Sequence, residues 1–281
     1  EPGTFCNRIN MERDPHLFIE GMIIAAFAVD SNYGYIYIRG EYGDAIERVG
    51  QALADCYANG VLGEDVLGTG YKLDLRLRRG AGAYICGEET ALFNSLEGKR
   101  GNPRFKPPFP ANYGLYGAPT TINNTQSLAS VPAIIRNGAK WFSNLGCEGS
   151  GGTGIFSVSG HVEKPGNYEL SLGIPFKEVL EIAGGVRGGR ALKAVIPGGS
   201  SVPVLPADVI MDLTMDFDTL QGIGSGLGTC AMVVMDDTTC MVNMLRRISR
   251  FYQAESCGQC TPCREGTGWL YRMLTRITRG E

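Results

Sequence analysis

A strand–helix–strand succession in the first 80 residues constrains the fold most strongly. Residues 33–39 read YGYIYIR, and residues 73–77 alternate leucine with charged side chains, so both are typical of strands. A helix is predicted between them, capped by Asp44 and ended by Gly60, because its apolar residues recur on one face. This order predicts a βαβ unit, in which a parallel sheet is covered by helices. A further helix is predicted over residues 13–29, with Asp14 as its N-cap.

The segment after the second strand is the first candidate site, because ligands of parallel sheets bind beyond the carboxyl ends of the strands. Residues 79–89 (RGAGAYICGEE) form a glycine loop that runs into a helix beginning near Glu88. Glycines let the backbone approach a flat or phosphorylated ligand, and the helix start offers free N–H groups. Glu88 and Glu89 suit ribose hydroxyls and would repel a 2′-phosphate, which favours NADH over NADPH. A tight turn whose glutamates complement the helix dipole explains the same residues.

Two later stretches carry further candidate ligand contacts. Lys106 begins the sequence KPPFP, in which prolines hold Phe109 where its ring could stack on a base or on nicotinamide. Asn123 and Asn124 offer both donors and acceptors to a flavin edge or a phosphate. Taken alone, these residues also fit a proline turn and an Asx turn. A helix predicted over residues 128–142 closes the first domain.

The rest of the chain divides by composition and period. Residues 146–154 (GCEGSGGTG) have linker composition, and the short strands and single helix that follow predict a compact α+β module. From Met241 onward apolar residues recur at helical spacing, so the C-terminal part is predicted to be helical. We therefore expect three domains, at residues 1–145, 153–236 and 240–281.

A cysteine cluster is the strongest chemical signal. Cys257, Cys260 and Cys263 recur at every third residue, and the intervening Gly and Pro favour a non-helical turn, so three thiolates can converge on one inorganic cluster. C-x₂-C-x₂-C is an iron–sulfur spacing, although zinc and a redox-active dithiol remain alternatives. A [4Fe–4S] cluster needs a fourth ligand. Cys230 and Cys240 are candidates within the chain, and a cysteine beyond its end is preferred.

Composition excludes several other classes. The net charge of -3 is too close to neutral for a nucleic-acid partner bound through its phosphates. The longest uninterrupted apolar run, residues 22–29, falls short of the roughly 18 residues of a membrane span. His16 and His161 are isolated and predict neither a catalytic triad nor a histidine metal site. Because the sequence opens on Glu-Pro-Gly-Thr without a starting Met, we expect a fragment of a longer protein.

Four motifs in register carry a family resemblance: residues 80–92, 106–111, 119–124 and 257–263. In this order they resemble the NADH-binding, FMN-bearing flavoprotein subunit of respiratory complex I, the NADH:quinone oxidoreductase, along the whole chain. The resemblance implies an N-terminally truncated, Rossmann-like α/β flavin domain. A ubiquitin-like β-grasp (SLBB) module and a C-terminal α-helical iron–sulfur domain are implied to follow it.

The resemblance also implies the cofactors FMN, NAD(H) and a [4Fe–4S] cluster. The positions that match FMN contacts are Gly87, Glu88, Glu89, Asn123 and Asn124. The positions that match NADH contacts are Glu1, Tyr84, Glu89, Lys106 and Phe109. The cluster ligands are Cys257, Cys260 and Cys263, with the fourth ligand beyond the chain end. Thr125-Gln126 stands where many relatives carry Val-Glu.

The implied activity is hydride transfer from NADH to FMN, followed by single-electron transfer to the cluster of a quinone-reducing respiratory complex. The implied partners are other peripheral-arm subunits, above all the thioredoxin-like [2Fe–2S] subunit and the large iron–sulfur subunit. The implied location is the cytoplasmic side of the inner membrane, or the matrix side in mitochondria. Since the family's glycine-rich nucleotide loop lies upstream of Glu1, the fragment is expected to be inactive alone.

Two alternatives remain open. A diaphorase subunit of an NAD-reducing hydrogenase or of an NAD-dependent formate dehydrogenase shares the same motifs. A non-enzymatic SLBB ligand-binding module belongs to a different class and leaves the three clustered cysteines unexplained.

Overall fold

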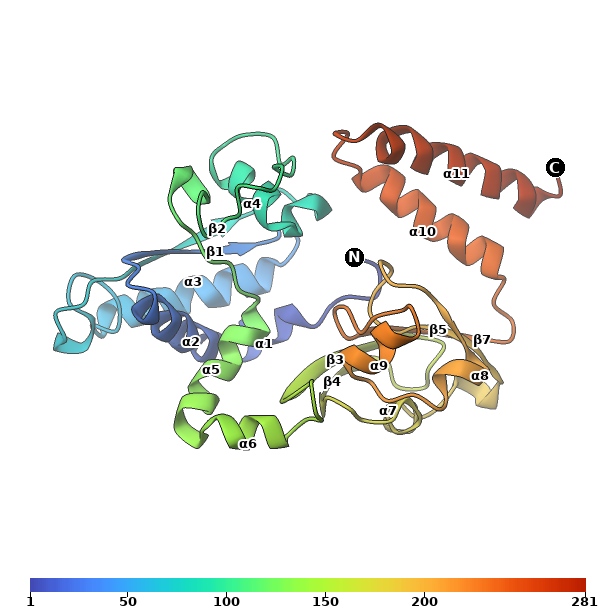
Figure 1. Cartoon of the computed structure of the whole chain (residues 1–281), viewed down its shortest axis with the longest axis horizontal. Coiled ribbons are helices and arrows are strands. Elements are labelled where there is room, and N and C mark those ends of the chain that lie inside the picture. Colours follow the sequence, from blue (N-terminus) through green and yellow to red (C-terminus); the bar gives the residue numbers. More distant parts are fainter. The chain divides into compact units, whose positions relative to one another are not determined.

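The computed structural model describes all residues from Glu1 to Glu281 and falls into two compact units. One unit, called the β-grasp unit below, combines Glu1–Ile9 with Ala133–Met241. The other holds the segments that the resemblance assigns to FMN, is called the flavin unit below, and combines Asn10–Pro132 with Val242–Glu281. Each unit is therefore assembled from two separate stretches of the chain (Figure 1). The boundaries expected at 145, 153, 236 and 240 stay a prediction.

The flavin unit contains the expected βαβ arrangement. β1 (Tyr33–Ile38) and β2 (Asp74–Arg79) pair in parallel, and α3 (Gly43–Ala58) connects them along the chain. The register runs from Tyr33 opposite Asp74 to Ile38 opposite Arg79. α3 buries one apolar face against the sheet, as its sequence period predicts, with Ala45, Val49 and Leu53 among the buried residues. The prediction of a strand, a helix and a parallel strand is confirmed.

The N-terminal side-chain caps predicted for two helices of this unit have different outcomes. α2 (Pro15–Ala28) begins as predicted, because the Asp14 carboxylate accepts a hydrogen bond from the Leu17 N–H at 3.2 Å. The predicted cap of α3 is wrong. Its N-cap is Tyr42, which makes no side-chain cap bond, and Asp44 lies inside the first turn, where its charge complements the helix dipole.

α2 is held very closely by a neighbouring segment. A Cβ atom at Gly21 would lie 1.8 Å from the backbone oxygen of Leu128, so only glycine fits there. α5 (Thr125–Asn137) carries Leu128, and α6 (Ala139–Asn144) follows it. The single helix expected over residues 128–142 is thus divided into two, because Gly138 between them has φ +88°.

The flavin unit holds several shorter helical segments. These are α1 (Asn7–Arg13), which begins in the other unit, the 3₁₀ turns η1 (Val66–Gly68), η2 (Tyr84–Gly87) and η3 (Leu115–Gly117), and α4 (Glu89–Leu96). Its hydrophobic core gathers around the buried side chains of Phe18, Ile19, Ile38 and Leu73.

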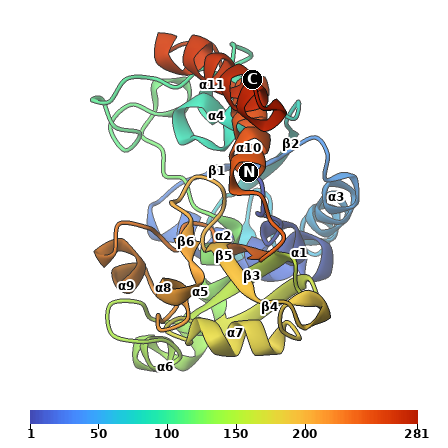
Figure 2. The same cartoon turned by 90° about the vertical axis from the view of Figure 1, so that its right-hand side faces the viewer.

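The β-grasp unit is built on a five-stranded mixed sheet of order β4-β3-β7-β5-β6. The central strand, β7 (Ala231–Asp236), pairs in parallel with β3 and antiparallel with β5, and it is not among the strands predicted from the sequence. α7 covers one face of the sheet (Figure 2), where Phe176 and Val179 join a core that includes Phe156 and Met232. The remaining elements are β3 (Thr153–Gly160), β4 (Gly166–Ser171), α7 (Phe176–Ile182), η4 (Arg187–Gly189), β5 (Leu192–Ile196), β6 (Leu205–Pro206), α8 (Ala207–Ile210) and α9 (Phe217–Gly222).

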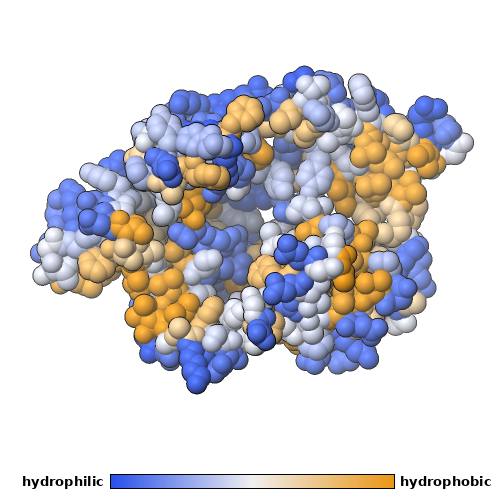
Figure 3. Space-filling view, viewed as in Figure 1, coloured by the Kyte–Doolittle hydropathy of each residue, from blue (hydrophilic) through white to orange (hydrophobic).

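Two helices end the chain, as the sequence predicts. α10 (Met241–Glu255) and α11 (Thr261–Arg279) are joined by residues 256–260, which hold the first two clustered cysteines. Apolar side chains gather over this helix pair (Figure 3), and the exposed ones on α11 are Trp269, Leu270, Met273 and Ile277. None of the helices has both the length and the apolar character that crossing a membrane requires.

Candidate functional site

The start of α4 brings the two predicted site glutamates to the surface of the flavin unit. Glu88 is the N-cap of α4, and its Oε2 accepts hydrogen bonds from the N–H groups of Thr90 and Ala91 at 2.9 Å each. The Thr90 hydroxyl donates to the same oxygen at 2.6 Å. One oxygen of Glu88 is therefore committed to its own helix, and Oε1 remains for another partner. Burial alone would raise the pKa of Glu88, but the bonds from Thr90, Ala91 and Lys106 outweigh it and lower that pKa.

Lys106 is the partner that the fold brings to both glutamates. Its Nζ lies 3.4 Å from Glu88 Oε1 and forms a short ion pair with Glu89 Oε1. The pKa of Lys106 is raised, chiefly by its hydrogen bond to Glu89. Two carboxylates against one ammonium leave this cluster with one net negative charge. It therefore suits hydroxyl groups and repels a further phosphate.

Phe109 extends the same loop with an exposed ring. Its side chain is 58% exposed, and the Lys106–Pro107 and Pro107–Pro108 peptide bonds before it are cis. The Phe109 carbonyl accepts from the N–H groups of Asn112 and Tyr113 at 2.9 and 3.0 Å, which fixes the turn behind the ring. An exposed aromatic face beside the Lys106 cluster can stack on a base or on nicotinamide.

Two features of the structure fit a flat, phosphorylated ligand such as FMN. A Cβ atom at Gly87 would meet nothing within 4 Å, so the backbone before α4 faces open space. The Thr125 hydroxyl oxygen is buried without a hydrogen-bond partner, directly after Asn123 and Asn124. Asn124 immediately precedes α5, and its Oδ1 accepts a hydrogen bond from the Gln126 N–H in the first turn at 2.9 Å. A bound ligand would occupy the open space beside the Gly87 backbone and would form a hydrogen bond with the unpaired Thr125 hydroxyl.

Tyr84, the remaining candidate of this loop, contacts the C-terminal helices. Its ring packs edge-to-face on Phe251 and Tyr252, with centroid distances of 5.2 and 6.2 Å. Its N–H donates to Glu255 Oε2 at 3.1 Å. The loop that carries the candidate ligand contacts is thus packed against the helix that precedes the cysteines.

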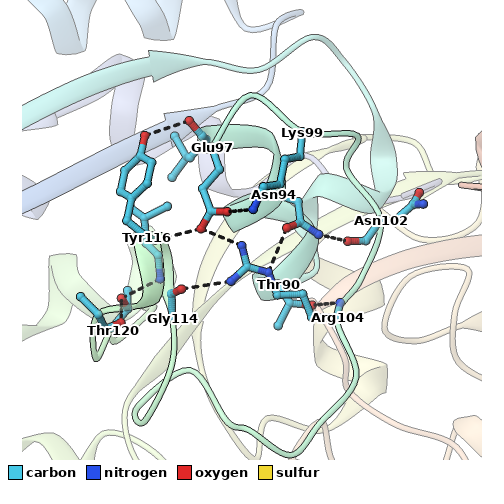
Figure 4. Close-up of polar contacts among 12 residues, drawn as sticks. Thr90, Asn94, Glu97, Lys99, Asn102, Arg104, Gly114, Tyr116 and Thr120 are labelled. Atoms are coloured by element: carbon cyan, nitrogen blue, oxygen red, sulfur yellow. Dashed lines mark hydrogen bonds and ion pairs between the residues drawn. The ribbon is translucent and has the colours of Figure 1, made fainter.

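A charged network behind the site fixes the loop that carries Lys106 and Phe109 (Figure 4). Glu97, at the C-terminus of α4, receives Lys99 Nζ and Arg104 Nη2 at 2.7 Å each, and the Tyr116 N–H at 2.8 Å. Its side chain is only 7% exposed. Burial alone would raise the pKa of Glu97, but these three partners outweigh it and lower that pKa to about 2.

Arg104 is the centre of this network. Besides Glu97, its guanidinium donates to Asn94 Oδ1 at 2.9 Å and to the Gly114 carbonyl at 3.0 Å, and Figure 4 shows these groups pointing toward one another. Asn94 in turn donates to the Asn102 carbonyl at 2.5 Å. A cavity of about 470 Å³ opens beside the network, lined by Glu97, Lys99, Arg104, Tyr113, Tyr116 and Gly117.

The three clustered cysteines surround a turn at the start of α11. Cys257 is half-buried, whereas Cys260, the N-cap of α11, and Cys263 are exposed. Gly258 makes the turn with φ +81°, and Cys263 Sγ donates to Ser256 Oγ at 3.4 Å. The side chains do not converge into a group ready to hold a metal ion. As a donor set they still fit an iron–sulfur cluster, because three free cysteines recur at every third residue at the start of α11.

The in-chain candidates for a fourth ligand differ in exposure. Cys230 is buried in the β-grasp unit, where burial raises the pKa of its thiol to about 12, so it is a poor source of a thiolate. Cys240 is exposed. A fourth ligand beyond the chain end stays a prediction.

Glu1 belongs to the β-grasp unit, unlike the other candidate contacts. Its Oε1 accepts from the Ser201 N–H at 2.9 Å and from the Ser201 hydroxyl at 2.5 Å. Its expected role toward NADH stays a prediction.

Comparisons with known proteins match the order of these parts. Residues 1–133 match the family model of the Nuo51 FMN-binding domain, residues 155–225 an SLBB domain, and residues 243–281 the NADH-ubiquinone oxidoreductase-F iron–sulfur binding region. The F-type subunit of NADH-quinone oxidoreductase from Rickettsia bellii is 54% identical over 283 residues, covering 100% of this chain and 68% of that protein. The same protein of Rickettsia typhi is 54% identical over 282 residues, covering 100% of this chain and 67% of that protein.

The chain belongs to the family of F-type subunits of NADH-quinone oxidoreductase. Among solved structures, the NAD⁺-reducing [NiFe]-hydrogenase in its H₂-reduced state is similar, with a TM-score of 0.89 and 35% sequence identity. That match covers 100% of this chain and 46% of the hydrogenase chain.

Membership in this family confirms the fold class, the cofactors and the NADH-oxidising activity that the four motifs imply, whereas the individual contact residues stay a prediction. The fold class is an FMN-binding α/β domain, an SLBB module and a C-terminal helical iron–sulfur region, in that order. FMN, NAD(H) and a [4Fe–4S] cluster are its cofactors, and the chain is a subunit of an NADH-oxidising, multi-subunit oxidoreductase. The alternative of an isolated SLBB module accounts only for residues 155–225.

Sequence reasoning did not find four residues that organise the site: Glu97, Arg104, Arg100 and Glu255. Glu97 and Arg104 form an ion pair across a loop. Arg100 and Glu255 take part in the hydrogen bonds that connect the residues around α4 to the loop of the three cysteines. No spacing of residues along the sequence predicts long-range pairs of this kind. The one available signal is that Glu255 lies two residues before Cys257.

Proposed function

We propose that the flavin unit binds NADH and FMN at the start of α4 and forwards electrons to a cluster held by Cys257, Cys260 and Cys263. The observation that supports this most directly is the cluster of Glu88, Glu89 and Lys106 beside the open backbone of Gly87. When bound, FMN accepts a hydride from NADH and releases electrons singly to the [4Fe–4S] cluster. The chain's own residues bind and orient NADH and FMN, and they select NADH over NADPH.

Nucleotide selection is the role of the acidic pair. Glu89, held against Lys106, accepts hydrogen bonds from ribose hydroxyls, and the net negative charge of the cluster disfavours the 2′-phosphate of NADPH. Phe109 offers an exposed ring for stacking on the adenine or the nicotinamide. Tyr84 lies between this loop and the C-terminal helices. It thus borders the path from the nucleotide to the cysteines.

Flavin binding is assigned to the backbone before α4 and to the Asn pair. Gly87 leaves the backbone accessible to the ligand, and Asn123 and Asn124 provide amide groups beside the unpaired Thr125 hydroxyl. A bound phosphate or ring edge would satisfy that hydroxyl, which otherwise costs about 1–3 kcal/mol when left unpaired in the interior.

The test of nucleotide selection is Glu89→Gln in the full-length protein loaded with its cofactors. We expect the ratio of NADPH to NADH oxidation rates to rise several-fold, because one repulsive charge is removed. The matched control is Glu64→Gln, which also breaks a Lys–carboxylate pair but at a site 83% exposed and away from α4. An unchanged NADPH-to-NADH ratio in the Glu89 variant contradicts the assigned role.

The test of the electron path is anaerobic reduction of the full-length protein with NADH, followed by absorbance and EPR spectroscopy. We expect the flavin absorbance to bleach and a reduced-cluster signal to appear. Serine substitution of Cys257, Cys260 or Cys263 is expected to remove the cluster signal while flavin bleaching remains. Bleaching and a normal cluster signal in all three variants would show that other residues hold the cluster.

The assembly around the chain forms a separate part of the proposal. The family name favours a quinone-reducing complex, with the thioredoxin-like [2Fe–2S] subunit and the large iron–sulfur subunit as neighbours in its peripheral arm. The corresponding location is the cytoplasmic face of the inner membrane, or the matrix face in mitochondria. The match to an NAD⁺-reducing hydrogenase favours a diaphorase as the second candidate. Co-purification from the native source, with assay of NADH:quinone and H₂:NAD⁺ activity, separates the two.

A further inference from the structure

Two hydrogen bonds tie the surroundings of α4 to the loop of the three cysteines. Arg100 Nη2 donates to the backbone carbonyl of Cys257 at 2.9 Å, and the Tyr84 N–H donates to Glu255 Oε2 at 3.1 Å. The donors lie on either side of α4, and the acceptors flank Ser256. Residues on either side of α4, where the nucleotide is proposed to bind, therefore hold the loop of the three cysteines at two points that are close together in sequence.

Arg100 lies directly against the turn that orients the first cysteine. A Cβ atom at Gly258 would lie 3.3 Å from Arg100 Nη2, so the guanidinium packs on the glycine that makes the turn. Arg264 approaches from α11 and donates to the Gly258 carbonyl at 3.0 Å. Two guanidinium groups thus hold successive backbone carbonyls of the loop. Because both bonds go to backbone oxygens, the Cys257 side chain stays available as a ligand.

We propose that Arg100 is a positioning residue for the iron–sulfur cluster. Arg100 orients Cys257 through the backbone carbonyl of that cysteine, and its positive charge raises the reduction potential of the cluster. This rests on the proposed function, in which Cys257, Cys260 and Cys263 hold a [4Fe–4S] cluster. Arginine stays charged at every accessible pH, so its effect is permanent. A fixed positive charge beside a cluster ligand stabilises the reduced cluster, which carries one more negative charge than the oxidised one.

The orienting part has a separate physical basis. The loop from Ser256 to Cys260 has no regular structure, and the Arg100 bond restrains the backbone at its first ligand. Loss of that bond leaves the carbonyl to water and lets the ligand move away from the cluster more often. The expected result is faster loss of iron to a chelator, an observable that does not depend on turnover of NADH.

The test uses the full-length, cluster-loaded protein and three variants. Arg100→Gln removes the charge, Arg100→Lys keeps the charge on a shorter stem, and Arg279→Gln removes an exposed charge in the last turn of α11. Two quantities are measured: the midpoint potential by EPR-monitored redox titration, and the rate of iron release to a chelator in the absence of NADH.

We expect Arg100→Gln to weaken cluster reduction about threefold to tenfold, a fall of about 30 to 60 mV for one electron. Iron release is expected to be several-fold faster. Arg100→Lys should keep the potential and release iron at an intermediate rate, and it carries the test if the Gln variant does not fold. Arg279→Gln should match the wild type in both.

Two outcomes overturn the inference, and they are distinguishable. If wild type and every folded Arg100 variant share one potential and one rate of iron release, Arg100 has no such role, while the proposed function stands. If the wild-type protein itself holds no cluster under these conditions, the proposed function fails and this inference with it.

Discussion

Removing the charge of Glu97 tests how the loop with Lys106 and Phe109 is held. Glu97→Gln keeps the size and one acceptor oxygen of the side chain but breaks its ion pairs with Lys99 and Arg104. Arg104 then remains mostly buried, with a side chain 22% exposed, and without its counter-charge. We expect the loop from Arg104 to Tyr116 to open more often.

The size of this effect follows from the lowered pKa of Glu97. A value of about 2, against 4.5 for the free group, means that folding favours the ionised form. Such a shift corresponds to about 3 kcal/mol at neutral pH. Because the folded pKa lies below the unfolded one, this contribution is complete above about pH 5 and is lost as the pH falls toward 2.

Hydrogen exchange on the full chain measures the effect locally. At pH 7 the amides of Arg104, Leu115 and Tyr116 should exchange roughly 150-fold faster in Glu97→Gln than in wild type. The difference should shrink as the pH is lowered from about 5 to 2, while Glu64→Gln leaves these amides unchanged. A difference that stays constant down to pH 2, or exchange equal to wild type at pH 7, would refute the account of this network.

Three further predictions concern packing, capping and thiol reactivity. Gly21→Ala forces a methyl group into the Leu128 backbone and should lower the free energy of unfolding in urea by about 1–3 kcal/mol or more. The control is Gly50→Ala inside α3, where the new Cβ would lie 3.7 Å from the nearest atom, a side-chain carbon of Leu77. It should raise the free energy of unfolding by about 0.5–1 kcal/mol. Asp216→Ala removes the N-cap of α9 and should cost about 1 kcal/mol in urea unfolding at pH 7. Burial opposes ionisation of Asp216, but bonds from Thr214 and Thr219 lower its pKa, so this loss should disappear as the pH falls below the ordinary range of an aspartate. Alkylation of the native chain, mapped by mass spectrometry, should label exposed Cys260 and spare Cys230, whose thiol has a pKa of about 12; equal labelling of both would contradict the buried placement.

Local patterns predict much of the fold, because they report on short-range physics. Asp14 caps its helix as expected, and the alternation of β2 places its leucines as a parallel strand requires. The same reasoning fails for Asp44, since an acidic residue near a helix start fits either the cap or the first turn. It also joined two helices across Gly138, although a glycine at that point is itself a recognised stop signal.

The candidate site shows a sharper division between what a sequence indicates and what it cannot. Glu88, Glu89 and Lys106 are each suggested by motif, but their pairing depends on how the loop returns to α4. Glu97 and Arg104 belong to no motif, and only the folded chain makes them partners. Long-range pairs of this kind leave no periodic trace, so spacing rules do not detect them.

The division of each unit into two stretches has a consequence for synthesis of the protein. On a ribosome, residues 10–132 emerge before residues 133–241, and α10 and α11 follow both. The Arg100–Cys257 and Tyr84–Glu255 bonds can therefore close only after the intervening unit has left the exit tunnel. Because Arg100 precedes the three cysteines in the chain, it has already emerged when their thiols become accessible to iron. Cluster insertion is thus best timed as a late step of maturation.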